Sequence, residues 1–199
     1  MHLALGSSAT PGEEASRRKR TELGFLADGP LPGHELRRQV SQLIGYTRPV
    51  SDGSLYPAIS RLAKAGLLER QADPRAGSHR YLVSLTEAGH AEMLERLRKP
   101  ADHEITDFTR FFTLLAFLSK LPDVSEQHAV LRRRLDFLEK PASFFYDGEK
   151  PLRAEEVDDP YRRGVLLTAR AISSAERDWL RDVLHEDPVD PSRTSGPST

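Results

Sequence analysis

The chain has 199 residues, with 29 basic and 30 acidic side chains and no cysteine. This length fits one domain or two small ones, and it is sufficient to bury a hydrophobic core. The lack of cysteine excludes a disulfide framework, a thiolate nucleophile and a cysteine-based zinc site. The longest apolar run, at residues 111–118, is too short to cross a bilayer, so we expect no membrane partner.

Charge is unevenly distributed along the chain. Residues 17–100 carry 15 bases and 9 acids, a net +6, whereas residues 101–199 carry 14 bases and 19 acids, a net −5. A polyanionic partner would therefore bind the first half, although ordinary variation also produces such an imbalance. The N-terminus has Glu13 and Glu14 before any Lys or Arg and no apolar core of a signal peptide, so we expect a cytoplasmic protein.

The N-terminal segment is expected to lead into a first helix. Residues 1–16 are rich in Gly, Ser, Ala and Thr and lack periodicity, which predicts a disordered lead. Arg17–Arg20 is a basic cluster, either an arm that touches DNA or the solvated start of the helix. The helix turns Leu23 and Leu26 inward and stops at Asp28-Gly-Pro30.

A second helix is expected to begin at Pro32-Gly-His-Glu-Leu36. Its apolar residues have helical spacing and are Leu36, Val40, Leu43 and Ile44. A loop at residues 45–49 separates it from a third helix. Two helices joined by a short turn are typical of a helix-turn-helix arrangement.

The third helix, within residues 51–68, is the most informative part of the chain. Its apolar stripe, spaced i, i+4 and i+7, consists of Leu55, Ile59 and Leu62. Ser51 or Asp52 can cap the start, and Gly66 can adopt the left-handed conformation that ends the helix. This pattern predicts a helix that is buried on one side only.

The polar side of this helix suits a phosphate backbone or a base edge. Ser51 and Ser54 can donate to phosphate, or they only cap the helix. Tyr56 places a hydroxyl near the helix start, or its ring packs against the following hairpin. Arg61 and Lys64 are cationic; Arg61 can pair with guanine or remain a surface cation.

Two strands are expected next, at Leu67–Ala72 and His79–Leu85, with a turn at Asp73–Ser78 between them. Such a hairpin beside a helix-turn-helix is the wing of a winged helix. Its basic residues, one of which we expect to reach a phosphate, are Arg75, His79 and Arg80.

The second half is expected to be helical. Thr86 can cap a helix that runs to Lys99, and Pro100 suits the start of another. Residues 101–185 predict three helices with two apolar seams. One seam comprises Ile105, Phe108, Phe112 and Leu115, and the other comprises Val130, Leu131, Leu135 and Leu138. The last helix starts at Asp159-Pro160 and carries Val165, Ile172, Trp179 and Val183.

The predicted fold class is mainly α-helical with a small β-hairpin. The expected parts are a disordered lead at 1–16, a winged helix-turn-helix DNA-binding domain at 17–99, a helical dimerisation and candidate effector domain at 100–186, and a disordered tail at 187–199.

Five strings of the first half occur in a recognisable order and spacing. They are Leu23-Gly-Phe-Leu-Ala-Asp-Gly-Pro-Leu31, Gly33-His-Glu-Leu36, Gly53-Ser-Leu-Tyr-Pro-Ala58, Arg61-Leu-Ala-Lys-Ala-Gly-Leu-Leu68 and Tyr81-Leu-Val-Ser-Leu-Thr-Glu-Ala-Gly89. These strings resemble the PadR family of bacterial transcriptional regulators. The resemblance covers residues 20–98 closely and residues 101–185 only in kind, because the family's longer members carry a helical C-terminal region of this size.

The resemblance implies a homodimeric transcription factor, usually a repressor. Each subunit would place the third helix in the major groove of one half of an inverted repeat in double-stranded DNA, and the wing would reach the adjacent backbone or minor groove. The C-terminal helices would build the dimer, and in several members a small effector loosens the grip on DNA. Residues expected to line an effector site or the dimer core are Phe112, Phe144, Phe145 and Trp179.

Two positions depart from the family's pattern. His34 stands where the family usually has tyrosine, and Asp52 stands where it often has proline. An acid at a helix start that meets DNA repels phosphate, although it can accept a hydrogen bond from cytosine or only cap the helix. A winged helix that binds proteins instead of DNA therefore remains an alternative.

Catalytic and metal-binding patterns are weak in this sequence. The seven histidines are scattered without the spacing of a helical zinc motif, and there is neither a Gly-rich phosphate loop nor a Gly-x-Ser-x-Gly string. The carboxylates of residues 155–159 precede Pro160 and suit a solvated helix start. We therefore expect no enzyme, no metal and no cofactor.

Overall fold

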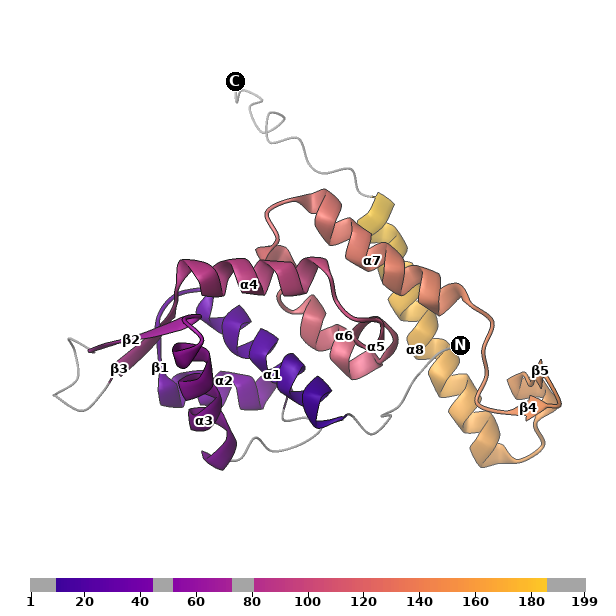
Figure 1. Cartoon of the computed structure of the whole chain (residues 1–199). Helices are drawn as coiled ribbons and strands as arrows, with labels where there is room; N and C mark the ends of the chain where they lie inside the picture. The colour runs from indigo at the N-terminus through magenta and orange to yellow at the C-terminus, as the bar shows by residue number, and fades with distance from the viewer. Residues whose placement is uncertain (1–9, 45–51, 73–80, 186–199) are drawn as a thin grey trace, which may run out of the picture. The chain divides into compact units, whose positions relative to one another are not determined.

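The computed structural model describes residues 10–44, 52–72 and 81–185 (Figure 1). They fall into two compact units, an N-terminal unit that ends at Pro122 and a C-terminal unit that begins at Asp123. The N-terminal unit contains α1 (Pro11–Leu26), β1 (Leu31–Pro32), α2 (Gly33–Ile44), α3 (Asp52–Lys64), β2 (Leu68–Ala72), β3 (Tyr81–Leu85), α4 (Glu87–Arg98), α5 (Asp102–Thr106), α6 (Phe108–Leu115) and the 3-10 turn η1 (Leu118–Lys120). The C-terminal unit contains α7 (Val124–Glu139), β4 (Tyr146–Asp147), β5 (Lys150–Pro151), the 3-10 turn η2 (Ala154–Glu156) and α8 (Pro160–His185). A mostly helical chain with a small antiparallel sheet confirms the predicted fold class.

Helix α1 is central to the N-terminal unit, where it contacts α2, α4, α6 and β3. Leu23 and Leu26 are 0% and 3% exposed, as the sequence predicts. The helix begins at Pro11, so the expectation of a disordered lead is wrong for residues 11–16. Proline suits the first helical position because its fixed φ is already helical and its missing N–H would have no helical partner there.

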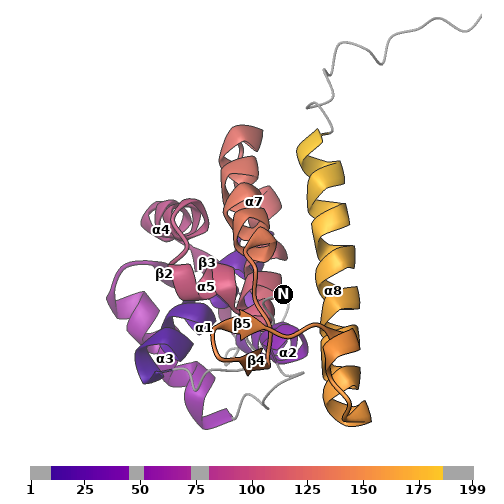
Figure 2. The same ribbon diagram turned by 90° about the vertical axis from the view of Figure 1, so that its right-hand side faces the viewer.

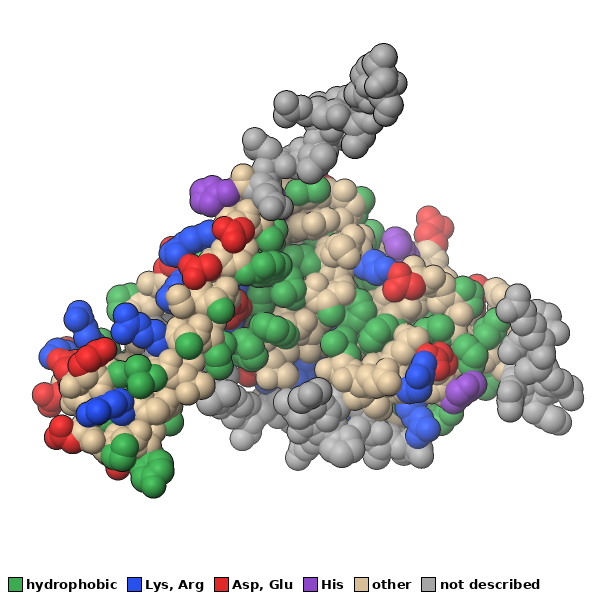
Figure 3. All heavy atoms as spheres, turned by 180° about the vertical axis from the view of Figure 1, so that it is seen from behind, with side chains coloured by type: hydrophobic (Ala, Val, Ile, Leu, Met, Phe, Trp, Pro, Cys, Tyr) green, Lys and Arg blue, Asp and Glu red, His purple; other side chains and the backbone are tan. Residues whose placement is uncertain are grey.

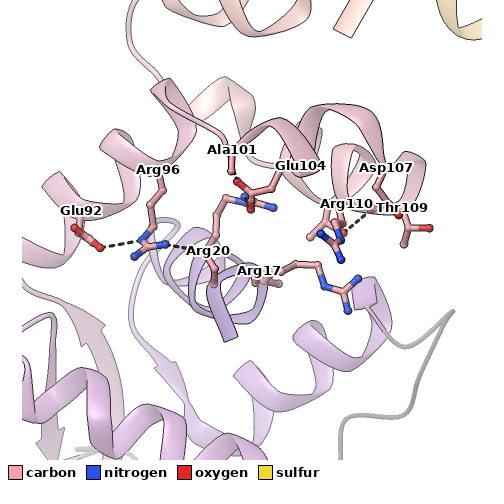
Figure 4. A network of polar contacts seen from close by, with 12 residues as sticks. Arg17, Arg20, Glu92, Arg96, Ala101, Glu104, Asp107, Thr109 and Arg110 are labelled. Atoms are coloured by element: carbon pink, nitrogen blue, oxygen red, sulfur yellow. Dashed lines mark hydrogen bonds and ion pairs between the residues drawn. The ribbon is translucent and has the colours of Figure 1, made fainter. Parts of the chain in front are cut away.

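The basic cluster at the middle of α1 joins helices together. Lys19 Nζ donates to Glu92 Oε1 of α4 at 2.8 Å. Arg20 is 1% exposed and pairs with Glu104 of α5; Figure 4 shows the two side chains directed toward one another. Burial lowers the pKa of Arg20 from its ordinary value, and the charge of Glu104 opposes that shift. Lys19 and Arg20 are therefore engaged within the unit and do not form a free arm.

Strand β3 lies between β1 and β2 in an antiparallel sheet. Leu68 pairs with Leu85 and Ala72 pairs with Tyr81, so β2 and β3 form the predicted hairpin, which extends from the helices of this unit in Figure 1. The sequence gives no sign of β1, because two residues are too few to show an alternating pattern.

Helices α5 and α6 pack with the N-terminal unit, which differs from the expected domain boundary near residue 100. The seam expected in this region is wrong at Phe112, which is 47% exposed, whereas Phe111 and Leu114 are fully buried. Phe117 covers α1: its ring meets Phe25 edge-on at 5.0 Å between centroids. Its atoms also lie 2.6 Å from where a Cβ on Gly24 would stand.

In the C-terminal unit α7 and α8 pack against each other (Figure 2). The predicted seam is buried at Val130, Leu131 and Leu138, each at most 3% exposed. An ion pair lies in the same interface: Arg134 Nε donates to Glu176 Oε1 at 2.7 Å and Nη2 donates to Oε2 at 2.9 Å. The two helices are thus joined by apolar contacts, by this buried bidentate pair and by a more exposed ion pair between Glu139 and Arg181.

The segment between α7 and α8 is attached by a small apolar cluster. Its buried members are Ala154, Val157 and Leu166, and the side chains packed against them are Phe144, Phe145 and Leu152. The cluster holds η2 and the β4–β5 hairpin beside the first half of α8.

Candidate nucleic-acid interface

Helix α3 ends as the sequence predicts. Gly66 has φ +73°, in the left-handed region. Its N–H donates to Ala63 O at 3.0 Å, and the N–H of Leu67 donates to Leu62 O at 3.0 Å. This pair of bonds satisfies carbonyls that the helix end would otherwise leave open. At the other end the helix begins at Asp52, whose side chain lies outside the described part, as does all of Ser51.

One side of α3 is buried and the opposite side is open. The predicted stripe is confirmed, with Leu55 and Ile59 at 0% and Leu62 at 7% exposure. Arg61 and Lys64 are both exposed and, being three residues apart, are neighbours on the helix surface. The side chain of Ser54 is not among those described, so its predicted phosphate contact stays a prediction.

Tyr56 combines packing with exposure. A Cβ built on Gly33 would lie 3.4 Å from Tyr56 Cε1 and 4.0 Å from the hydroxyl oxygen of Tyr81, so the Tyr56 ring packs at the start of α2. Tyr56 is nevertheless 41% exposed. Its ring is therefore held against α2 while part of the side chain remains available to a partner.

Arg70 of β2 belongs to this surface and was not singled out in the sequence. Its Nη2 donates to Ser60 Oγ of α3 at 2.8 Å, and its guanidinium carbon lies 4.9 Å from the centroid of the Tyr81 ring. The side chain therefore links α3 to both strands of the hairpin. Its charge could have indicated an exposed position, although alternation along β2 places it on the same face as the buried Leu68. Its bond to Ser60 depends on how the strand docks on α3.

Thr86 connects the end of α3 to the start of α4. Its Oγ1 accepts from the N–H of Gly89 at 3.0 Å, which confirms the predicted cap, and donates to Gly66 O at 2.7 Å. Its own N–H donates to Leu67 O at 3.2 Å. One residue therefore satisfies groups at two helix ends.

A buried acid lies within the electrostatic reach of α3. Glu22 of α1 is 1% exposed, and neither carboxylate oxygen has a hydrogen-bond partner among the described residues. Burial raises the pKa of Glu22 to about 7, although the positive charges of Arg18 and Arg61 oppose that rise. The charge of Arg61 thus acts on a titratable group of the same unit.

The remaining predicted DNA contacts cannot be placed. Arg75, His79 and Arg80 lie between β2 and β3, outside the described residues. Among the predicted DNA-binding side chains, the structure therefore describes Tyr56, Arg61 and Lys64, and all three are exposed on α3.

The four aromatic residues expected around an effector are divided between the two units. Phe112 lies on α6 of the N-terminal unit, with its ring 4.3 Å from that of Phe108. Phe145 lines a small hollow of about 290 Å³ in the C-terminal unit, and Phe144 packs in the adjoining apolar cluster. Trp179 is 42% exposed on α8. Neither unit by itself brings all four together.

Neither a membrane span nor a metal site is found among the described residues. None of their helices is both long and apolar enough to cross a membrane. Their His, Asp and Glu side chains form no group of three or more that could hold a metal ion.

Comparison with known proteins gave a family match over the winged helix. The model of the transcriptional regulator PadR-like family matches residues 23–95. No curated protein is significantly similar to the chain.

Several solved structures are similar at low identity. Bacillus subtilis PadR in complex with operator DNA is 19% identical, with 83% of this chain and 95% of that chain covered and a TM-score of 0.38. Bacillus subtilis PadR in complex with p-coumaric acid is 19% identical, with coverages of 84% and 96% and a TM-score of 0.38. The PadR-like transcriptional regulator BC1756 from Bacillus cereus is 16% identical, with coverages of 91% and 99% and a TM-score of 0.39. The family match confirms the resemblance seen in the sequence: residues 23–95 are a domain of the transcriptional regulator PadR-like family.

Proposed function

We propose that this chain is a dimeric, sequence-specific DNA-binding regulator, and that it acts as a repressor in the cytoplasm. The observation that carries the proposal is the open side of α3, where Tyr56, Arg61 and Lys64 are exposed opposite a buried apolar stripe. Cationic and hydroxyl side chains on an exposed helix face can bind phosphates and base edges. That face belongs to a domain whose family regulates transcription.

In the proposed complex α3 enters the major groove of one half-site. Arg61 binds a base edge or phosphate, Lys64 binds phosphate, and Tyr56 donates its hydroxyl near the helix start. Ser51 and Ser54 bind phosphate beside that start. The residues between β2 and β3 reach the neighbouring backbone, and those proposed to do so are Arg75, His79 and Arg80.

An exposed apolar stripe on α8 supports a second copy of this chain as the partner. Val165, Ile172 and Trp179 are spaced seven residues apart and are 43%, 37% and 42% exposed. The stripe lies beside the face that α8 buries within its own unit, which includes Leu166 and Leu180. Pairing two copies through such stripes shields them from water and supplies two α3 helices for an inverted repeat.

The proposal also includes a small effector that releases the protein from DNA. The aromatic side chains at Phe112, Phe144, Phe145 and Trp179 are the candidates taken from the sequence for an effector site. Trp179 is the only tryptophan in the chain, so quenching of its fluorescence by added compounds is a direct screen.

The test is binding of a labelled DNA duplex, selected from random sequence, at several salt concentrations. Each phosphate contact is expected to add about 0.9 to the slope of log affinity against log salt. Lys64→Ala should lower the slope by about one such contact, whereas Arg132→Ala, an exposed position on α7, should leave it unchanged.

The same experiment separates DNA binding from the protein-interaction alternative. A slope of log affinity against log salt near zero would show that the winged helix works through another protein. Full regulatory function after the combined change Arg61→Ala and Arg80→Ala would show the same. Asp52 and the near-neutral isoelectric point of 6.7 are the features that agree with that alternative.

A further inference from the structure

The C-terminal unit contains a cleft that the DNA-binding proposal does not use. Two adjoining hollows of about 610 and 720 Å³ share Ala142, Leu152, Arg153 and Arg177 as lining residues. They lie where the end of α7, the β4–β5 hairpin, η2 and α8 meet. Each volume falls within the range of small-molecule sites.

The polar lining of the cleft is predominantly cationic. Its bases are Lys140, Arg153, Arg170, Arg177 and Arg181. Of its three acids, Glu139 accepts from Arg181 at 2.7 Å. Glu156 accepts from Lys150 at 2.5 Å and from the backbone N–H of Arg153 at 2.8 Å. On the left of Figure 3, the side of this unit that faces the viewer shows Lys and Arg interspersed with acids and hydrophobic patches.

Positive charge remains after these pairs are taken into account. The side chains of Lys140 and Arg153 form no ion pair with any residue in the described ranges. Arg170 approaches Glu155 only to 3.7 Å, with both side chains about two-thirds exposed. Such a pair is weak and can be exchanged for a ligand.

Arg177 provides a preorganised donor in the middle of the cleft. Its Nη1 donates to Leu138 O at 3.3 Å and to Ser173 Oγ at 3.0 Å. Ser173 is 2% exposed, so the anchor itself is fixed. These bonds leave the Nε and Nη2 groups for an anion, and a planar guanidinium can bind a carboxylate or phosphate through two parallel bonds.

The rest of the lining is apolar. Leu138, Leu152, Ala154 and Leu166 line the same two hollows, and three of these four residues are buried. A ligand that fits both features has an anionic group and an apolar body.

We propose that this cleft binds a small organic anion, a carboxylate or phosphate attached to an apolar ring or chain, with Arg177 and Arg153 as its principal partners. The residues of α8 that line the cleft are Leu166, Arg170, Ser173, Arg177 and Arg181, and the same helix carries the stripe proposed for dimerisation. A ligand that prefers one arrangement of α8 would therefore change dimer affinity, and by linkage DNA affinity. Only this regulatory consequence rests on the proposed function.

Calorimetric titration of the full chain without DNA tests the site. The probes are naphthoate, naphthyl phosphate and the uncharged naphthamide. We expect saturable binding of at least one anion, at least roughly ten-fold tighter than binding of the amide, because charge-assisted hydrogen bonds distinguish them. No saturable binding of either anion, or equal binding of the amide, overturns the proposal.

Variants locate the bound anion. Arg153→Met and Arg177→Met should each weaken anion binding by roughly ten-fold, and Arg132→Met, outside the cleft, should leave it unchanged. Arg153 is exposed and forms no ion pair with a described residue, so its variant tests the site even if Arg177→Met unfolds. Binding that survives both Arg153→Met and a folded Arg177→Met overturns the assignment. Since DNA is absent, failure of the DNA-binding proposal would not affect this outcome.

Discussion

Glu22 places an ionisable carboxyl group inside the N-terminal unit without a hydrogen-bond partner among the described residues. Its pKa is raised by burial to about 7, from an ordinary value of 4.5, so the folded chain holds the proton more tightly than the unfolded chain. The corresponding stability is fully present below pH 4.5 and is lost as the pH rises through about 7.

Replacement by the neutral isostere should remove that pH dependence. Glu22→Gln is expected to be more stable than the native chain at pH 8, by at most about 3 kcal/mol, and similar to it at pH 5. Urea unfolding of the two proteins at several pH values measures the difference in their free energies of unfolding at pH 8 and at pH 5. Equal pH dependence in the two proteins would mean that Glu22 is solvated or paired in solution.

Gly89 illustrates a requirement for the smallest side chain. A Cβ at this position would lie 2.0 Å from Leu67 O, a backbone atom that cannot move aside alone. Gly89→Ala is therefore expected to separate α4 from the end of α3 and to reduce the free energy of unfolding by about 1–3 kcal/mol or more.

Thermal unfolding followed by circular dichroism tests the Gly89 prediction against a matched helical glycine. Gly164, in α8, has open space around its Cβ position. Gly164→Ala should stabilise by up to about 1 kcal/mol, because alanine has the higher helix propensity. The same sign of change in both variants would contradict the steric argument.

At the scale of elements, the pair formed by Arg134 and Glu176 is a buried charged contact between α7 and α8. Arg134→Met leaves the Glu176 side chain, which is 7% exposed, in an interface without its partner, a change that typically costs about 3–5 kcal/mol. Adding Glu176→Leu should restore most of that loss, because two apolar side chains can replace a buried ion pair. A double-mutant cycle by urea unfolding measures the coupling, and additive losses would show that the pair is solvated.

The sequence predicts elements whose determinants are local. The stripe at Leu55, Ile59 and Leu62, the helix end at Gly66 and the cap at Thr86 depend on neighbours within one or two turns, and all are confirmed. Periodicity cannot say which neighbour a face will meet.

Features that depend on distant neighbours were missed or misplaced. Arg20 and Glu104 are 84 residues apart, and β1 exists only because β3 passes beside it. Phe112 lies on an apolar seam by spacing, yet α6 buries Phe111 instead. The surface of α3 was therefore predictable, whereas the contacts of Arg70 and the cleft in the C-terminal unit were not.

For the whole molecule, the dimer proposal predicts a change of mass. Ile172→Asp places a charge in the middle of the exposed stripe on α8 and should convert dimer to monomer, measured by light scattering after size exclusion. DNA affinity should fall with it, because one α3 can then occupy only one half-site.

Leu167→Asp is the matched control for the dimer prediction. Leu167 is 50% exposed on the same helix but lies outside the stripe, so the mass should not change. Equal effects of the two substitutions would show that charge on α8, and not loss of the stripe, is responsible.

The double role of Thr86 restricts which residues evolution can place there. Aspartate is as good a helix cap as threonine in general, since it also accepts from the backbone. An ionised carboxylate could accept from Gly89 but could not donate to Gly66 O, and would repel that carbonyl. Only serine among the other usual caps supplies both functions from one small oxygen atom. A hydroxyl residue between a strand and Glu-Ala-Gly is therefore a criterion for finding the same junction of helices in other chains.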